Sequence, residues 1–111
     1  MKFNVIPTEN FKRAAKRLIL KFPSLKDELK ELSVMLSVEP ETGVSLGFNV
    51  YKIRLSIKSK GKGKRGGGRV ITYIVSSKNE IYLLAIYDKS EFDTIDNKRL
   101  KTIIKGLLPG K

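Results

Sequence analysis

The sequence contains no cysteine, histidine or tryptophan among its 111 residues. Without cysteine the chain has no disulfides, no thiolate ligands for zinc and no thiol nucleophile. Without histidine it lacks the usual general base near neutral pH, and a Ser-His-Asp triad is excluded. Proton transfer would therefore depend on lysine, tyrosine, aspartate, glutamate or water, and we predict neither a metal site nor a cofactor.

Long apolar runs are also missing. The longest, residues 81–87, is far shorter than the roughly 20 residues that a helix needs to cross a bilayer. The first residues, Met1-Lys2-Phe3-Asn4, do not lead into the apolar segment that is typical of a secretion signal. We therefore expect a cytoplasmic protein that does not use a membrane.

Acidic residues are scarce: the chain has 11 Asp and Glu but 23 Lys and Arg, which leaves a formal charge of +12. Such an excess indicates a polyanionic partner, and nucleic acid is the commonest one. An acidic protein or an anionic membrane surface would satisfy the same balance. The length is that of one domain, covering residues 1–111, and it is large enough to bury a core.

The first half of the chain predicts a strand at residues 2–6 and two helices. Thr8 is a candidate N-cap for a helix that begins near Glu9, carries apolar residues at helical spacing and stops before Pro23. Ser24 and Asp27 resemble a capping box for a second helix that ends near Val38. The short connection favours an antiparallel helical hairpin.

The second half has the period of β-strands. Residues 51–57 alternate between apolar and cationic side chains, and residues 69–76 form a second strand. Glu80–Asp88, apolar on both sides, predicts the central strand of the sheet. Asn97–Leu107 reads as a helix that buries Leu100, Ile103, Ile104 and Leu107. The order β-α-α-β-β-β-α predicts an α+β fold, with helices covering one face of a mostly antiparallel sheet.

Basic residues concentrate in one segment. Residues 50–70 contain no acidic residue and eight basic ones: Lys52, Arg54, Lys58, Lys60, Lys62, Lys64, Arg65 and Arg69. Strand alternation places Lys52 and Arg54 on one side of the sheet, about 7 Å apart. Adjacent like charges destabilise a sheet unless an anion binds there. The alternative is an ordinary solvated face.

Residues 59–69 form a loop rich in glycine and lysine. Gly61, Gly63 and Gly66 match the spacing G-x-G-x-x-G, but a dinucleotide site requires a strand followed by a helix, whereas this loop joins two strands. It is not a Walker A loop, because Arg65 and not Ser or Thr follows Lys64. Two interpretations stay open: a flexible hairpin loop, or amides and cations that wrap an RNA phosphate backbone. The second assigns RNA contacts to Lys58, Lys60, Lys62, Lys64 and Arg65.

Tyrosines and acidic residues give weaker signals. Tyr73 and Tyr87 are candidates for stacking on a base or for proton transfer, although half-buried tyrosines more often only pack. An acidic cluster follows the last strand: Asp88, Glu91, Asp93 and Asp96. Capping and pairing with lysine are favoured there over a metal site.

Three segments together resemble the RelE/ParE toxin superfamily. They are Tyr51-Lys52-Ile53-Arg54-Leu55, the Gly-Gly-Arg69-Val-Ile-Thr-Tyr stretch, and the Leu83-Leu84-Ala-Ile-Tyr-Asp-Lys89-Ser-Glu stretch. The glycine- and lysine-rich loop and the ending Tyr-Asp-Lys-Ser-Glu are most similar to its HigB-like branch. The resemblance spans nearly the whole chain.

The resemblance implies the toxin of a type II toxin–antitoxin pair, with a cognate antitoxin as partner. RelE-like members cleave mRNA on the ribosome without a metal, by attack of the ribose 2′-hydroxyl on the neighbouring phosphate. The matching residues here are Lys52, Arg54, Arg69 and Lys89. The ParE-like branch shares the fold and acts on DNA gyrase, and a non-catalytic basic RNA-binding module is a further alternative.

The chemistry of these residues is consistent with RNA cleavage. The phosphorane formed by 2′-hydroxyl attack carries extra negative charge, which preorganised cations stabilise more than the ground state. Arg69 suits this task because its guanidinium offers a fixed fork of donors. The neighbouring charge of Arg54 disfavours the ammonium form of Lys52, which makes Lys52 the candidate base.

Overall fold

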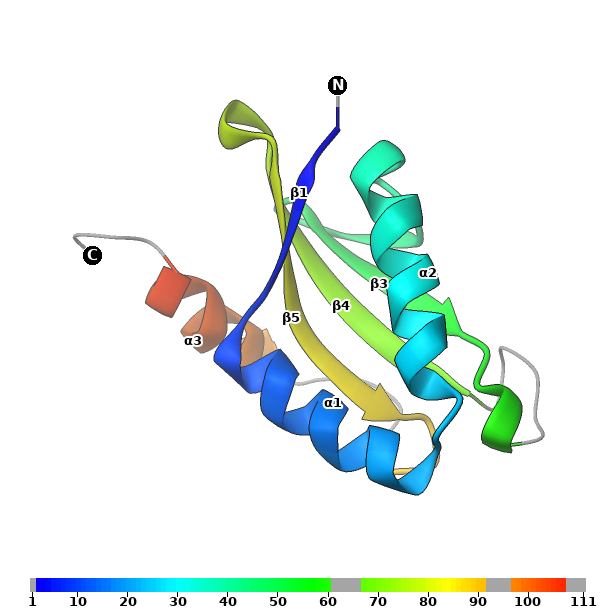
Figure 1. The fold of residues 1–111 in the computed structure, drawn as a ribbon. Coiled ribbons are helices and arrows are strands. Elements are labelled where there is room, and N and C mark those ends of the chain that lie inside the picture. The colour runs from blue at the N-terminus through cyan, green and yellow to red at the C-terminus, as the bar shows by residue number, and fades with distance from the viewer. Residues whose placement is uncertain (1, 61–66, 92–96, 108–111) are drawn as a thin grey trace.

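The computed structural model describes residues 2–60, 67–91 and 97–107 (Figure 1). Its elements are β1 (Asn4–Pro7), α1 (Glu9–Lys21), α2 (Leu25–Val38), β2 (Val44–Gly47), β3 (Val50–Leu55), β4 (Gly68–Val75), β5 (Glu80–Asp88) and α3 (Asn97–Leu107), with 3₁₀ turns at Lys58–Lys60 and Ser76–Lys78. The sheet has the strand order β1-β5-β4-β3-β2. Among the strands of the described residues, β1 alone runs parallel to its neighbour, β5. The predicted α+β class and the mostly antiparallel sheet are confirmed.

Helix α1 begins and ends where the sequence predicts. The hydroxyl of Thr8 accepts a hydrogen bond from the backbone N–H of Phe11 (3.2 Å) and donates one to the carbonyl of Leu83 (2.9 Å). One group thus caps the helix and ties its start to β5. The helix stops at Lys21, since Pro23 disfavours the helical region for Phe22.

The start of α2 differs from the predicted capping box. Ser24 has helical backbone angles, and its side chain caps no helical N–H. Its hydroxyl instead donates to Glu28 (3.2 Å) and accepts from the backbone N–H of Ser59 (2.9 Å). The sequence signal at Ser24 therefore reports a tertiary contact between α2 and the segment after β3.

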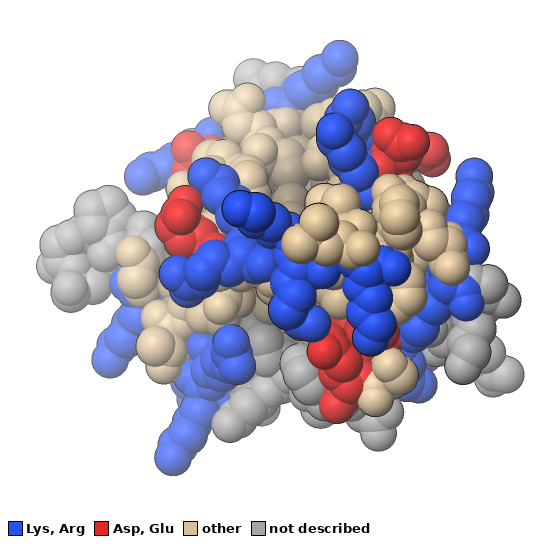
Figure 2. All heavy atoms as spheres, turned by 60° about the horizontal axis from the view of Figure 1, so that its bottom comes forward, with Lys and Arg blue, Asp and Glu red and all other residues tan. Residues whose placement is uncertain are grey.

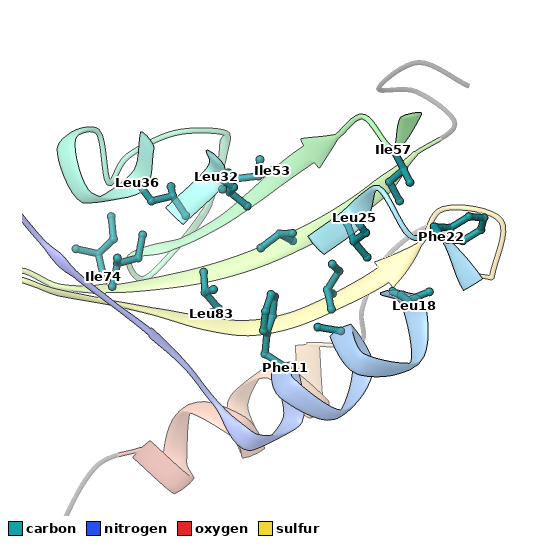
Figure 3. Close-up of a cluster of buried hydrophobic side chains, with 14 residues drawn as sticks. Phe11, Leu18, Phe22, Leu25, Leu32, Leu36, Ile53, Ile57, Ile74 and Leu83 are labelled. Carbon is teal, nitrogen blue, oxygen red and sulfur yellow. The ribbon is translucent and has the colours of Figure 1, made fainter. Parts of the chain in front are cut away.

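The hydrophobic core lies between the sheet and the helical hairpin. Figure 1 shows α1 and α2 on the same side of the strands, and Figure 3 shows the side chains that fill the space between them. Phe11 and Leu18 of α1 and Leu25 and Leu36 of α2 are all buried against β-strand residues such as Ile53. Burial of this face positions the sheet, and with it the residues on the opposite face.

Helix α3 corrects the expectation that all helices cover one face. Its Ile103 and Ile104 pack against a second cluster formed by Val50, Ile71, Leu84, Ala85 and Tyr87. Ile71 alternates along β4 with Val70, which belongs to the core beneath α1 and α2. The face of the sheet opposite α1 and α2 therefore carries α3. The side chains of Leu100 and Leu107, also predicted to point inward, lie outside the described part of the chain.

Two details of the strands were not predicted. Strand β2 was missed, and it forms the edge of the sheet beside β3. Strand β5 is not the central strand as predicted: it lies between β1 and β4, and β4 occupies the central position. In the described part of the chain, no helix has the length and apolar character needed to span a membrane.

Candidate nucleic-acid interface

Three of the four residues assigned to RNA chemistry lie together on the sheet face that carries α3. Lys52 and Arg54 alternate along β3 with residues of the helix-side core. Arg54 is paired in register with Arg69 of β4, and Arg69 with Tyr87 of β5. Side chains paired in this way have Cβ atoms about 5 Å apart. Lys52, Arg54 and Arg69, called the cation row below, therefore concentrate positive charge at one end of this face.

The members of the cation row differ in depth. Arg54 is exposed and Lys52 is partly buried, whereas Arg69 is only 3% exposed. The Nη1 of Arg69 donates to the carbonyl of Gly68 (3.0 Å). The sequence assigned Arg69 a fixed fork of donors for the phosphate, and in the structure its charge lies beneath the surface.

Lys89 lies at the same end of the sheet. Its backbone N–H donates to the carbonyl of Gly67 (3.0 Å), two residues before Arg69. Gly67 in turn packs tightly on β3, since a Cβ there would lie 2.1 Å from the carbonyl oxygen of Leu55. This close packing fixes the backbone of Lys89 next to the start of β4, and its side chain is partly buried.

Lys60 has a different role from the RNA contact assigned to it. Its ammonium forms an ion pair with Asp88, and the side chains are only 10% and 1% exposed. The ammonium also lies 5.8 Å from the centre of the Phe22 ring. Burial tends to raise the pKa of Asp88, but hydrogen bonds from Lys60 and Ser90 outweigh burial, and the pKa is lowered. Lys60 therefore stabilises the end of β5 and is not available to a phosphate.

The segment before the glycine-rich loop is tied to α2. The buried carboxylate of Glu28 accepts a hydrogen bond from the backbone N–H of Lys58 (2.8 Å). The hydroxyl of Ser59 accepts one from the backbone N–H of Ser24 (2.7 Å). The side chain of Lys58 remains exposed, so its assigned RNA contact stays a prediction. Lys62, Lys64 and Arg65 lie outside the described residues.

The two candidate tyrosines are separated by the structure. Tyr87 stands next to Arg69 but is 2% exposed, so it cannot stack on a base in this conformation. Tyr73 lies four residues along β4 from Arg69, beside α3. Neither tyrosine therefore adds an exposed ring to the cation row. Nearby, Tyr82 donates to Glu80 (2.8 Å), and this hydrogen bond together with burial raises its pKa.

The acidic cluster forms ion pairs. Asp88 pairs with Lys60, and Glu91 forms two contacts with the guanidinium of Arg17 (3.1 and 3.3 Å). In the described residues no group of carboxylates is arranged to hold a metal ion. Asp93 and Asp96 lie outside the described residues.

A second basic surface lies on the outer side of α1, where the sequence analysis assigned no function. Figure 2 views the molecule from the lower side of Figure 1, where α1 lies, and shows many lysine and arginine side chains and few acidic ones. Five exposed cations of α1 contribute: Lys12, Arg13, Lys16, Arg17 and Lys21. They occupy the helix positions opposite the apolar stripe, a signal that is visible in the sequence.

Comparison with known proteins identifies the fold. No family model matches the sequence. Among solved structures, a doubly substituted variant of the Escherichia coli toxin RelE in the free state superposes with a TM-score of 0.61 at 18% identity, covering 97% of this chain and all of that one. A crystal structure of the isolated E. coli RelE toxin gives 0.58 at 16% identity, covering 96% of this chain and 99% of that one. The chain therefore has the RelE fold over nearly its whole length.

Proposed function

We propose that this protein is the toxin of a toxin–antitoxin pair and that it inhibits translation by cutting mRNA on the ribosome. Its fold is that of the E. coli toxin RelE. The observation that carries the proposal is the cation row. Lys52, Arg54 and Arg69 lie together on one face of the sheet, where their positive charge is complementary to the phosphates of RNA. The partners of such a protein are a cognate antitoxin, the ribosome and mRNA.

The proposed reaction is attack by the ribose 2′-hydroxyl on the adjacent phosphate. Lys52 is the proposed base: it takes the proton of the hydroxyl, the 2′ oxygen bonds to phosphorus, and the bond to the 5′ oxygen breaks. The leaving 5′ oxygen takes up a proton, so the products are a 2′,3′-cyclic phosphate and a 5′-hydroxyl end. The nucleophile is the substrate's own hydroxyl, and the proposed step is metal-independent.

Positive charge lowers the barrier of this step. Arg54 is exposed and lies beside Lys52, where it contacts the phosphate as negative charge develops on it. Buried Arg69 is directly opposite Arg54 and adds a fixed charge from below, in surroundings of low dielectric constant. Lys89, at the end of β5, completes the proposed set.

The proposed branch of the superfamily is the HigB-like one. Its support is the glycine- and lysine-rich loop and the ending Tyr87-Asp88-Lys89-Ser90-Glu91. The similarity to RelE supports the wider superfamily and does not distinguish between its branches.

The proposal is tested by expressing the chain in bacteria and following translation, mRNA and DNA together. We expect amino-acid incorporation to stop within minutes, and we expect mRNA fragments that end in a 2′,3′-cyclic phosphate. Intact mRNA with DNA breaks and altered supercoiling would instead assign the chain to the gyrase-directed branch. Unchanged translation would leave a non-catalytic binding module.

A further inference from the structure

The turn between β2 and β3 holds an aromatic residue in a strained conformation. Phe48 and Asn49 form a two-residue hairpin turn, and both have positive φ, 53° and 65°. Turns of this kind favour Asn-Gly, because a bulky side chain is strained in the left-handed region. The Phe48 side chain is nevertheless 93% exposed, so it contributes almost no burial to the fold. Strain without burial points to a role outside the fold.

The turn forms one wall of a groove against α3. The groove has a volume of about 740 Å³ and is lined by Leu46 and Phe48 on one side and by α3 on the other. Val50 and Tyr73 of the sheet and Ile104 of α3 supply further apolar lining between the two sides. The carbonyl of Asn49 accepts the N–H of Ile74 (3.0 Å), which anchors the turn to β4 and holds the wall in place.

The rim of this groove is positively charged. Lys101 and Lys105, one helical turn apart on α3, are exposed beside it. No acidic residue lines the groove in the described part of the chain. An apolar lining with a cationic rim is complementary to a segment that carries apolar side chains on one side and carboxylates on the other.

We propose that this groove, called the Phe48 groove below, binds an acidic protein segment with an apolar stripe. Phe48 is the anchor, because exposed aromatic rings supply much of the binding energy at interfaces. The aliphatic side chains of Leu46, Val50 and Ile104 argue against RNA as the occupant, since riboses and phosphates leave their methyl groups uncovered. The cation row differs, since each of its three members carries a positive charge.

The Phe48 groove is independent of the cleavage step. It lies beside α3, along β4 from Arg69, and none of its lining residues belongs to the cation row. A protein partner of the proposed toxin would supply such a segment. The groove would also bind one if the chain cleaved no RNA.

The probe is a fluorescein-labelled 18-residue synthetic peptide with leucines at helical spacing and glutamates elsewhere. Its binding to the full chain is measured by fluorescence anisotropy at low salt. A scrambled peptide of the same composition has no stripe and is expected to bind at least tenfold more weakly. Equal affinities for the two peptides would show that charge alone attracts them, which would overturn the proposal.

Substitutions locate the contact. Phe48→Ala and the double variant Lys101→Glu/Lys105→Glu are each expected to weaken peptide binding at least tenfold. Matched controls are Leu20→Ala, an 82% exposed apolar residue on α1, and Lys26→Glu/Lys30→Glu, exposed lysines of the same spacing on α2. The affinity for the peptide is expected to stay within twofold of wild type for Leu20→Ala and within threefold for the lysine pair. Equal losses in groove and control variants would contradict the proposal.

A competition experiment decides between protein and RNA. A twelve-residue oligouridine is added to the labelled peptide complex, and its own affinity is measured for the wild type and for Phe48→Ala. If oligouridine displaces the peptide and loses tenfold affinity with Phe48→Ala, the groove is an RNA platform and the proposal is wrong. Arg54→Ala should bind the peptide as tightly as wild type, because Arg54 lies outside the Phe48 groove. Peptide binding therefore tests the groove independently of the cleavage proposal.

Discussion

Lys60 and Asp88 form a buried ion pair that stabilises the end of β5. The pair joins Lys60, in the segment that follows β3, to Asp88, the last residue of β5 and the one before Lys89. Oδ1 of Asp88 binds both Lys60 and the backbone N–H of Ser90, whereas Oδ2 has no partner among the described residues. Removing the charge of Asp88 would leave the ammonium of Lys60 buried without its counter-ion, which is costly.

We therefore predict that Asp88→Asn lowers the free energy of unfolding by about 2 kcal/mol. Urea denaturation followed by circular dichroism measures the change. The control is Glu9→Gln, which removes a surface ion pair with Lys12 (3.2 Å) and should leave the midpoint unchanged. Equal stability of Asp88→Asn and wild type would show that the pair contributes nothing to the fold.

The same carboxylate predicts a pH dependence. The pKa of Asp88 is lower in the folded state than its ordinary value, so its contribution is fully present above about pH 4. The contribution is lost as pH falls through the lowered folded-state pKa. Denaturation curves between pH 6 and pH 2 should therefore show a steeper loss of stability for wild type than for Asp88→Asn. Parallel curves for the two proteins would contradict this assignment.

At the residue scale, the sequence predicted which side of a strand a side chain occupies but not how deeply it lies. Alternation placed Lys52 and Arg54 correctly on one face. Burial depends on neighbours that are distant in the chain, so the sequence could not show that Arg69 and Tyr87 are covered. For the same reason the sequence does not show the role of Lys60, because its partner Asp88 lies 28 residues away.

At the scale of elements, the β2–β3 hairpin is the part whose sequence agrees least with its structure. Two non-glycine residues occupy left-handed conformations at its tip. At Phe48 this conformation costs about 1 kcal/mol relative to glycine, and Phe48 recovers little of this by burial.

We predict that Phe48→Gly raises the free energy of unfolding by up to about 1 kcal/mol, because it relieves the strained backbone. Phe48→Ala keeps a side chain in the left-handed region and should leave stability within about 0.5 kcal/mol of wild type. Thermal and urea unfolding measure both variants. A clear loss of stability in Phe48→Ala would mean that Phe48 serves the fold and not a partner.

The elements with strong periodicity were predicted closely, and the weak ones were not. The bounds Glu80–Asp88 and Asn97–Leu107 agree with the structure, since long apolar patterns specify an element without help from neighbours. Strand β2 was missed, because a fully exposed four-residue strand between Gly43 and Phe48 has no pattern of its own. The prediction of the sheet face covered by α3 was wrong, because an amphipathic helix fits either side of a sheet with two apolar faces.

At the scale of the whole molecule, the charge of +12 includes two basic surfaces besides the rim of the Phe48 groove. One is the cation row at the end of the sheet, and the other is the outer side of α1 (Figure 2). Each phosphate that a cation neutralises releases counter-ions, so RNA binding should weaken steeply with salt.

We predict that the affinity for single-stranded RNA falls linearly on a plot of log K against log salt concentration. Arg54→Ala should make this slope shallower by about 0.7, which corresponds to the loss of one phosphate contact on a single strand. The measurement is a salt titration with oligouridine and fluorescence anisotropy. An unchanged slope in Arg54→Ala would remove Arg54 from the RNA interface.

The proposed function requires the cation row to act on the scissile phosphate of ribosome-bound mRNA. The most direct test is a reconstituted translation reaction in which mRNA cleavage is followed by primer extension with wild type, Arg54→Ala and the control Lys30→Ala. Arg54 and Lys30 are both exposed, so neither substitution is expected to disturb the fold. The account predicts cleavage at least about 100-fold slower for Arg54→Ala, and cleavage within twofold of wild type for Lys30→Ala. Equal cleavage by all three proteins, or none by wild type, would contradict it.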